Sequence, residues 1–466
     1  MKNSGDTANN EALLEQRIGE WRSYVSRRQA VHTVDVDELE DHLRSQVEAL
    51  TQAGLAPDEA FLVAVKRMGD LDSVSREFAS EYTERLWKQL VVAQPPSDES
   101  AASARRESRL AVVLAIAAAV AMKAPELFGK HLADGPDMAF YMHNVSILVL
   151  PFLAGFFAFK RALPRAGWFW QLMPFLAGAL IINLMPFSRV GDEPARTEVL
   201  AFIHLPIAIW LCTGFAYTGG RWRDHDQRMN FVRFCGEWFI YFVLIALGGA
   251  LLIAFTLFIF EAIGFKVETL VQQWIAPCGA AGAVVIAAWL VEYKKSVIEN
   301  MAPVLTMIFT PLFTVLLLVF VATMILTGNA IDVGREVLIG FDLLLVLVLA
   351  LLLYSISARD SLAAPGRFDR LQLLLVLSAL VVDVLALWAI AARISEFGFS
   401  PNKTVALGLN VLLLVNLGGS ALLYARFLSK RSPFTSLERW QTSYLPAFAV
   451  WAWIVVAIFP VIFKYQ

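Results

Sequence analysis

The sequence predicts an all-α polytopic membrane protein, with about eleven transmembrane helices behind a small cytoplasmic helical domain. Composition is the first reason: 58% of the 466 residues are hydrophobic and only 17% are charged, whereas soluble chains carry about a quarter charged residues. The second reason is that charge gathers in residues 1–109, while the rest consists of long apolar runs. A run of about 18 or more apolar residues can cross the hydrocarbon as a helix. The expected parts are a helical domain at 1–90, a flexible linker at 91–108 and a transmembrane domain at 109–466.

Residues 12–88 predict three or four short amphipathic helices that fold as a unit. The clearest helix places its apolar residues at helical spacing, so that they share one face. These residues are Leu39, Leu43, Val47 and Leu50. Gly54 fits the C′ position that ends this helix, Pro57 opens the next helix, and Asp70 caps a third. His32 and His42 have no third ligand at a fitting distance in the sequence and are read as surface residues.

The same region carries a recognisable set of motifs. It contains an ELEDHL helix, an AGLAPDEA turn, an AVKRMGD corner and a closing REF, all within residues 35–82. In these features it resembles the permease prefix domain, which is close to the sensory HAAS-type domains. The resemblance implies a regulatory module in front of bacterial membrane proteins, many of them permeases, often beside PadR-type regulators. That family has no known catalytic residues, so none transfers. A solubilising helical cap without a partner is the alternative interpretation.

The sequence also predicts a linker and the positions of the membrane spans. Residues 91–108 hold Pro-Pro, Ser and Ala without a periodic pattern, which predicts a flexible tether. The expected spans lie near 109–125, 138–159, 168–187, 199–217, 238–263, 272–291, 302–327, 337–356, 371–391, 403–425 and 442–462.

The loop charges predict the orientation of the spans. With the N-terminus in the cytoplasm, the cytoplasmic loops hold roughly twice as many Lys and Arg residues as the opposite loops, as the positive-inside rule requires. The C-terminus then lies outside. We therefore expect a multi-pass protein of the bacterial inner (plasma) membrane, with the lipid bilayer as its surroundings. The sequence carries no signal for an oligomeric state.

Two acids lie deep in the predicted spans. Asp342 falls in the eighth span and Asp383 in the ninth. Because a charge in hydrocarbon is costly, an intramembrane acid is a functional hypothesis by default. Neighbouring antiparallel spans would let these two share a proton or bind a cation. The alternative is that each acid is a structural residue, protonated or hydrogen-bonded to a neighbouring helix.

Other polar residues in the spans are secondary candidates. Glu261 lies near the outer end of the fifth span, His143 in the second and His204 in the fourth. Histidine and asparagine commonly join helices in membranes through hydrogen bonds, so packing is the competing explanation for these residues. The fifth and tenth spans also share a Gly-Gly pair, at Gly248 and at Gly418, which is weak evidence for an inverted repeat.

One predicted cytoplasmic loop is unusually rich in arginine. It contains Arg221, Arg223, Arg228 and Arg233. These side chains are predicted either to bind lipid headgroups or to dock the acidic helices of the N-terminal domain. A role in topology alone is the third interpretation.

Several function classes lack support in the sequence. It has no Walker motif, nucleophile elbow or HExxH motif, so we expect no enzyme and no cofactor. Its three cysteines do not form a metal knuckle, and a net charge of −2 does not indicate a nucleic-acid partner. Two hypotheses remain: a regulated transporter or permease-like protein, or a membrane-embedded signalling protein. The second would relay envelope state to a cytosolic partner, such as a PadR-type regulator, through residues 1–90.

Overall fold

The computed structural model describes residues 14–21, 33–69, 98–132, 136–188, 194–262, 266–293, 301–327 and 335–466. These residues are almost entirely helical and include no strand, which confirms the predicted all-α class. The chain divides into two compact units, residues 1–104 and 105–466.

In the described part of the first unit, three helices pack around a small core. They are a helix over residues 14–21, α2 (Thr33–Gln52) and α3 (Pro57–Gly69). The core residues are Ile18, Trp21, Leu43, Val47, Leu50, Ala60, Phe61, Ala64 and Val65. Three of the four apolar residues predicted on one face of α2 are therefore buried; the side chain of Leu39 lies outside the description. The helix predicted after Asp70 also falls outside the described residues, as do His32 and the side chain of His42.

The turn between α2 and α3 has the predicted chemistry. Gly54 has a φ of 100°, the left-handed conformation that favours glycine. Its N–H donates to Thr51 O at 3.0 Å, and the Leu55 N–H donates to Leu50 O at 3.2 Å. This pair of bonds is a Schellman motif, which satisfies the last carbonyls of the helix. Leu55 then packs on the core, as its position after Gly54 predicts.

Two ion pairs fasten the first helix of this unit to the others. Arg44 Nη1 lies 2.6 Å from Glu15 Oε1, and Arg17 Nη1 lies 2.9 Å from Asp58 Oδ1. The hydrogen bond from Arg44 lowers the pKa of the Glu15 carboxyl. Charge thus supports a core that is small by the standards of an independent domain.

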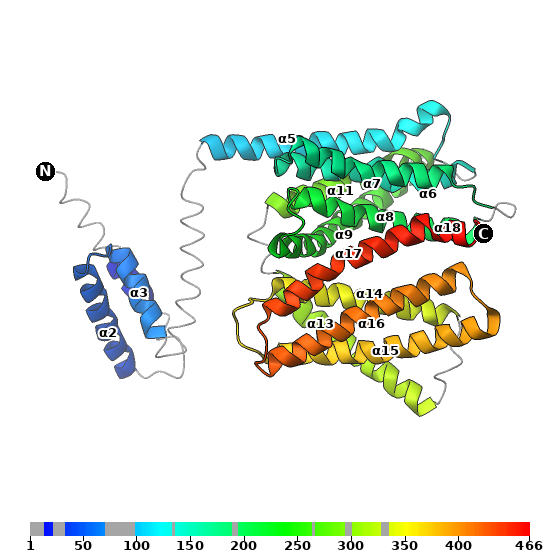
Figure 1. The fold of residues 1–466 in the computed structure, drawn as a ribbon. Helices are drawn as coiled ribbons and strands as arrows, with labels where there is room; N and C mark the ends of the chain where they lie inside the picture. The colour runs from blue at the N-terminus through cyan, green and yellow to red at the C-terminus, as the bar shows by residue number, and fades with distance from the viewer. Residues whose placement is uncertain are drawn as a thin grey trace. The chain divides into compact units, whose positions relative to one another are not determined.

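The second unit is a bundle of long helices (Figure 1). They are α5 (Asp98–Lys123), α6 (Pro136–Lys160), α7 (Arg165–Leu184), α8 (Arg196–Tyr217), α9 (His225–Ala262), α11 (Ala276–Tyr293), α13 (Met301–Thr327), α14 (Arg335–Ala358), α15 (Arg367–Phe397), α16 (Pro401–Leu428) and α17 (Thr435–Ala457). Short helical pieces adjoin them: η1 (Ala124–Phe128), α10 (Glu268–Leu270), the π-helical η2 (Val271–Ile275) and α18 (Phe459–Ile462). Ten helices within the described ranges are long and apolar enough to cross a membrane. The chain is therefore a multi-pass membrane protein.

The predicted eleventh span falls on α17 and α18. The first half of α17 carries Gln441 and Thr442, which are buried against the bundle, and α17 is not among the ten apolar helices. It packs against α8 on one side and α16 on the other. Its polar side chains therefore face protein, and the helix has less need of an apolar surface.

Two large hydrophobic cores account for most of the buried apolar residues of the bundle, and two smaller clusters adjoin them. One is formed by α5, α6, α7, α8, α9 and α11, and the other mainly by α13, α14, α15 and α16. The beginning of α9 joins the two, since Phe231 and Phe234 lie in the first core while Met229 and Val232 lie in the second. In Figure 1, α17 runs between the two groups of helices.

The helices alternate in direction, so that alternate loops meet at the same end. The start of α5 and the C-terminus lie at opposite ends of this unit (Figure 1). At the end with the start of α5, which we call the basic end, Lys160 pairs with Glu107 and, at 3.2 Å, with Glu292. At the other end, the Thr197 N–H donates to Gln466 O at 2.8 Å. This pairing of ends agrees with the predicted alternation of loops.

The predicted flexible linker is wrong over residues 98–108, because these residues form the start of α5. Asp98 and Glu99 occupy its first turn, where acidic residues interact favourably with the helix dipole and so stabilise the helix. The following Ala and Arg residues are strong helix formers. Residues 91–97 lie outside the described residues.

The two Gly-Gly pairs have different surroundings. A Cβ on Gly248 or Gly249 would meet nothing within 4 Å, whereas a Cβ on Gly419 would overlap the indole ring of Trp440. The half of α9 that follows Trp238 has no buried residue. Since one pair faces outward and the other makes room for a tryptophan, their surroundings do not support the inverted-repeat hypothesis.

The α16–α17 contact generates a test with adjacent residues. Gly419→Ala should destabilise the protein by about 1–3 kcal/mol, because the new methyl would overpack against Trp440. Gly418→Ala is the control, since nothing lies within 4 Å of a Cβ there; it should be neutral or stabilising by up to ~1 kcal/mol. Thermal unfolding of the detergent-solubilised chain measures both. Equal unfolding temperatures for the two variants would contradict the packing.

Candidate intramembrane acid site

The two predicted acids lie at the same depth. Asp342 is 16 residues before the end of α14 at Ala358, and Asp383 is 16 residues after the start of α15 at Arg367. At 1.5 Å per residue, each lies about 24 Å from the basic end of its helix. The sequence predicts a difference of about 4–5 Å, because its estimated span boundaries fall inside the real helices.

Asp383 is fully buried without a hydrogen bond. Its exposed fraction is 0%, and among the described residues neither carboxyl oxygen has a hydrogen-bond partner. Its neighbours on the buried face of α15 are apolar: Ala379, Val382 and Ala386 are each 0% exposed. An ionised carboxylate in such surroundings would lack the hydrogen bonds that make burial of a charge tolerable.

Asp342 is held from a third helix. Asn410 of α16 donates its Nδ2 to Asp342 Oδ1 at 2.7 Å and to Ala406 O at 2.9 Å. Asn410 is 0% exposed, and its Oδ1 has no hydrogen-bond partner among the described residues. Asp342 also lies within electrostatic range of Asp383. The three side chains therefore gather polar oxygens from three helices in one buried region, which we call the acid site.

Cation binding at the acid site stays a prediction, and the composition of the site is compatible with it. The site contains three buried oxygens that have no hydrogen-bond partner among the described residues, two on Asp383 and one on Asn410. Two carboxylates that repel each other in a low dielectric are stabilised by a proton or a metal cation. The sequence supplies Asp342 and Asp383, but nothing in its spacing identifies Asn410 as their partner, because residue 410 reaches Asp342 only through the packing of α16.

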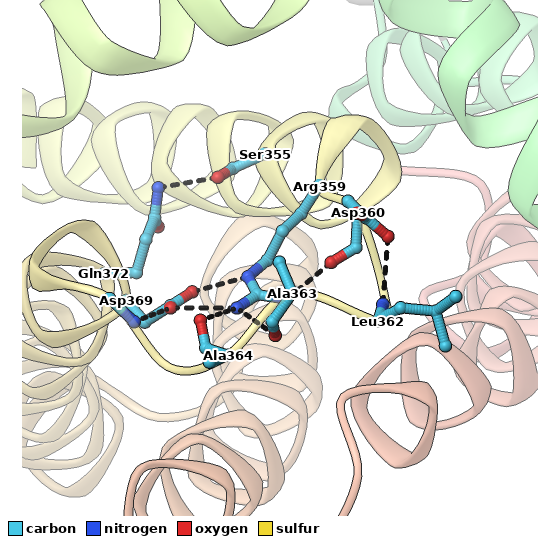
Figure 2. Close-up of polar contacts among 9 residues, drawn as sticks. Ser355, Arg359, Asp360, Leu362, Ala363, Ala364, Asp369 and Gln372 are labelled. Carbon is cyan, nitrogen blue, oxygen red and sulfur yellow. Dashed lines mark hydrogen bonds and ion pairs between the residues drawn. The ribbon is translucent and has the colours of Figure 1, made fainter. Parts of the chain in front are cut away.

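A group of hydrogen-bonded polar side chains around Gln372 lies closer to the basic end than the acid site does (Figure 2). Gln372 of α15 donates to Thr310 Oγ1 at 3.0 Å and to Ser355 Oγ at 2.8 Å, so it joins α13, α14 and α15. Its own Oε1 has no hydrogen-bond partner among the described residues. Gln372 precedes Asp383 by 11 residues, about three helical turns, so both lie on the buried face of α15.

Arg359 closes the turn between α14 and α15 (Figure 2). Its Nε donates to Asp369 Oδ1 at 2.8 Å, and its Nη2 donates to Asp369 Oδ2 at 3.1 Å. The remaining donors reach carbonyls of Asp360, Ala363 and Ala364. A planar guanidinium suits this many-sided contact, which an ammonium would not reproduce. The start of α15, and with it the depth of Asp383, is thereby fixed relative to α14.

Two of the four arginines of the predicted arginine-rich loop, Arg228 and Arg233, lie inside α9 and make contacts within the bundle. Arg233 is not free to bind a headgroup or a domain, because its Nε donates to Ser357 O at 2.9 Å and caps the end of α14. Arg228 is buried beside His225, 3.0 Å from its Nδ1. Both lie within α9, which begins earlier than predicted. Arg221 and Arg223 are exposed, and for them docking stays a prediction.

The secondary candidates lie away from the acid site. Glu261 is exposed near the end of α9. The His204 Nδ1 lies 2.8 Å from Leu200 O, one turn earlier in α8, which is a local contact. His143 Nε2 lies 2.9 Å from Glu198 Oε1, and both line a cavity of about 320 Å³. Sequence reasoning missed Glu198, since an acid in the first turn of a helix is ordinary there.

Comparison with known proteins adds no assignment. No protein-family model matches the chain, and no curated protein or solved structure matches it either. The resemblance of residues 35–82 to the permease prefix domain therefore stays a prediction. Within the described residues, no group of three or more His, Cys, Asp or Glu side chains could hold a metal ion.

The contacts of Arg359 with Asp369 and with the turn carbonyls allow a test of how the acid site is positioned. Arg359→Lys should destabilise the protein by about 1–3 kcal/mol, because the charge-assisted bonds to Asp369 and the turn carbonyls are lost. Arg370→Lys is the matched control, since Arg370 is exposed. Thermal unfolding and hydrogen exchange of the 360–366 turn measure the effect. Equal protection of this turn in both variants would contradict the role of Arg359.

Proposed function

We propose that this chain is a transporter-like membrane protein whose transport is coupled to a proton or a monovalent cation at the acid site. The observation that carries the proposal is the complete burial of Asp383 with both carboxyl oxygens unpartnered among the described residues. A buried acid without partners is costly to ionise, so occupancy by a cation changes the energy of the site substantially.

The site is suited to coupling because it spans three helices. A cation on Asp383 and Asp342 removes the repulsion between α15 and α14, and Asn410 links α16 to the same event. A ligand shifts a conformational equilibrium only by its different affinity for the two states. Exposure of the acid site to opposite sides of the membrane in two states would provide that difference. The substrate class is open.

A second candidate is a membrane-embedded relay that signals to a cytosolic partner through the first unit. The observation in its favour is that α5 runs without interruption from Asp98 into the bundle. Within the bundle, Glu107 of α5 pairs with Lys160 of α6. A helix fixed in this way can carry a displacement at its start into the membrane unit. The resemblance to the permease prefix domain fits both candidates.

The proposal predicts that the stability of the chain depends on a cation bound at Asp383. A proton bound only by the folded state adds up to about 1.4 kcal/mol of stability per unit decrease in pH. Asp383→Asn should abolish this dependence, or the corresponding dependence on Na⁺ against choline, in thermal unfolding of the purified chain. Glu396→Gln is the control, because Glu396 is exposed on the same helix and should leave the dependence unchanged.

The pH series and the Na⁺ series of this experiment distinguish a bound proton from a bound metal cation. A response to pH without a response to Na⁺ identifies the proton, and the reverse identifies the metal cation. If the parent and Asp383→Asn respond identically to both, the acid is structural and the proposed coupling is wrong. If removal of residues 1–90 abolishes a stoichiometric cytosolic partner while Asp383→Asn has no effect, the relay is favoured.

The orientation of the chain in the membrane is part of the proposal. We infer that the basic end faces the cytoplasm and the C-terminus lies outside, in the bacterial inner membrane, because the loops at that end carry most of the Lys and Arg residues. An alkaline phosphatase fusion after Gln466 should be active, and a green fluorescent protein fusion there should be dark. A C-terminal reporter active only in the cytoplasm contradicts the inference.

A further inference from the structure

A cavity lies beside the first core, and no residue of the acid site lines it. It has a volume of about 530 Å³ and lies between α5, α6, α8, α9 and α11. On α6 its wall runs from Val145 to Leu150, the middle of that helix. The cavity therefore lies within the depth of the hydrocarbon, and its size falls in the range of roughly 300–1,000 Å³ that holds drug-sized ligands.

The cavity walls present apolar surface. Trp210 and Trp238 contribute their rings, but their indole N–H groups are used elsewhere, on Cys235 Sγ at 3.3 Å and on Val284 O at 3.0 Å. Pro206 and Pro277, in α8 and α11, also line the cavity. A proline ring prevents the preceding turn from closing its regular hydrogen bond, which leaves room beside the helix.

One polar side chain interrupts this apolar lining. Ser146 lines the cavity and is 5% exposed. Its Oγ has no hydrogen-bond partner among the described residues. A serine hydroxyl in a membrane helix ordinarily donates to a carbonyl of its own helix or of a neighbour. The hydroxyl of Ser146 remains free to bond a guest in the cavity.

The cavity borders the outer surface of the bundle. Ile207 and Ala280 are exposed and also line the cavity, at positions inside two of the apolar spans. A molecule dissolved in the bilayer can therefore enter from the side, without passing through water.

We propose that this cavity binds a neutral, lipid-soluble molecule with a long apolar body and one hydrogen-bonding oxygen, such as a long-chain alcohol or carbonyl compound. The apolar body fills the space between the tryptophans and prolines, and the oxygen pairs with Ser146. An unsubstituted hydrocarbon would leave the buried hydroxyl unpaired, which costs more than forming the bond gains. This binding site is independent of the proposed function, because no residue of the acid site lines it.

The test uses the full chain in phosphatidylcholine nanodiscs and a diazirine-bearing long-chain alcohol as the probe. After photolysis, mass spectrometry should locate the label on the cavity walls of α6, α8 and α11. Unlabelled hexadecanol should compete better than hexadecane. Labelling spread evenly over the exposed half of α9, in place of the cavity walls, overturns the proposal.

Variants test the cavity and its serine separately. Ala280→Trp should fill the mouth and reduce wall labelling several-fold, while Gly279→Trp is the matched control on the neighbouring position, which is exposed, does not line the cavity and has nothing within 4 Å of its Cβ. Ser146→Ala should raise the hexadecanol concentration for half-competition by about 2- to 12-fold, the equivalent of about 0.5–1.5 kcal/mol, and leave hexadecane unchanged.

Each variant result has a contrary outcome. Equal labelling in Ala280→Trp and Gly279→Trp overturns the cavity as the binding site. Equal competition by hexadecanol before and after Ser146→Ala overturns the recognition of an oxygen. Size-exclusion elution and thermal unfolding confirm that each variant is folded, and Ser146→Ala, which removes a single atom, keeps the test decisive if Ala280→Trp fails to fold.

Discussion

A bilayer supplies no hydrogen-bond partners, and the bundle is arranged to satisfy this constraint. Several of its buried polar side chains are paired across helices. Asn416 of α16 donates to Gln441 of α17 at 2.9 Å, and Gln441 donates to Ser420 at 2.7 Å. Asn144 and Asn183 exchange two amide hydrogen bonds between α6 and α7. Because each of these pairs would be costly to break in hydrocarbon, they fix the rotation of their helices, which apolar packing alone would leave loosely specified.

Apart from Asp342 and Asp383, several charged side chains near the ends of the helices also hold helices together. Glu292 is buried at the end of α11, and both Lys160 of α6 and Arg161, which follows that helix, pair with it. Arg233 of α9 caps α14 through the carbonyl of Ser357. The second contact joins the two helix groups at the basic end. It is favourable because the carbonyl end of a helix is electrically negative. A basic residue at this end therefore has two uses, since it can direct topology and also hold helices together.

Among the exceptions is Asp383, because both of its carboxyl oxygens lack a hydrogen-bond partner among the described residues. Its neighbours on the buried face of α15 are apolar, and it interacts electrostatically with Asp342, which accepts a hydrogen bond from Asn410. Ser146 is a second exception, in the other core, with a hydroxyl that faces a cavity. Polar groups left unpaired in hydrocarbon are expensive, and for this reason we propose a ligand for each of the two. The two cases differ in kind: a pair of acids suits a small cation, whereas a lone hydroxyl in an apolar cavity suits a neutral lipid-soluble molecule.

The sequence by itself determined the all-α class, the number of apolar spans to within one and the α2–α3 turn at Gly54. Apolar run length and helical spacing are local properties that need no knowledge of neighbours. It also identified Asp342 and Asp383, because a charged residue inside an apolar run can be recognised from the sequence alone. Only the tertiary structure decided that Asn410 bonds Asp342, that Glu198 bonds His143 and that Arg233 caps α14. These contacts depend on how each helix is rotated and which helix lies beside it, and that is fixed by side-chain packing between segments far apart in the chain.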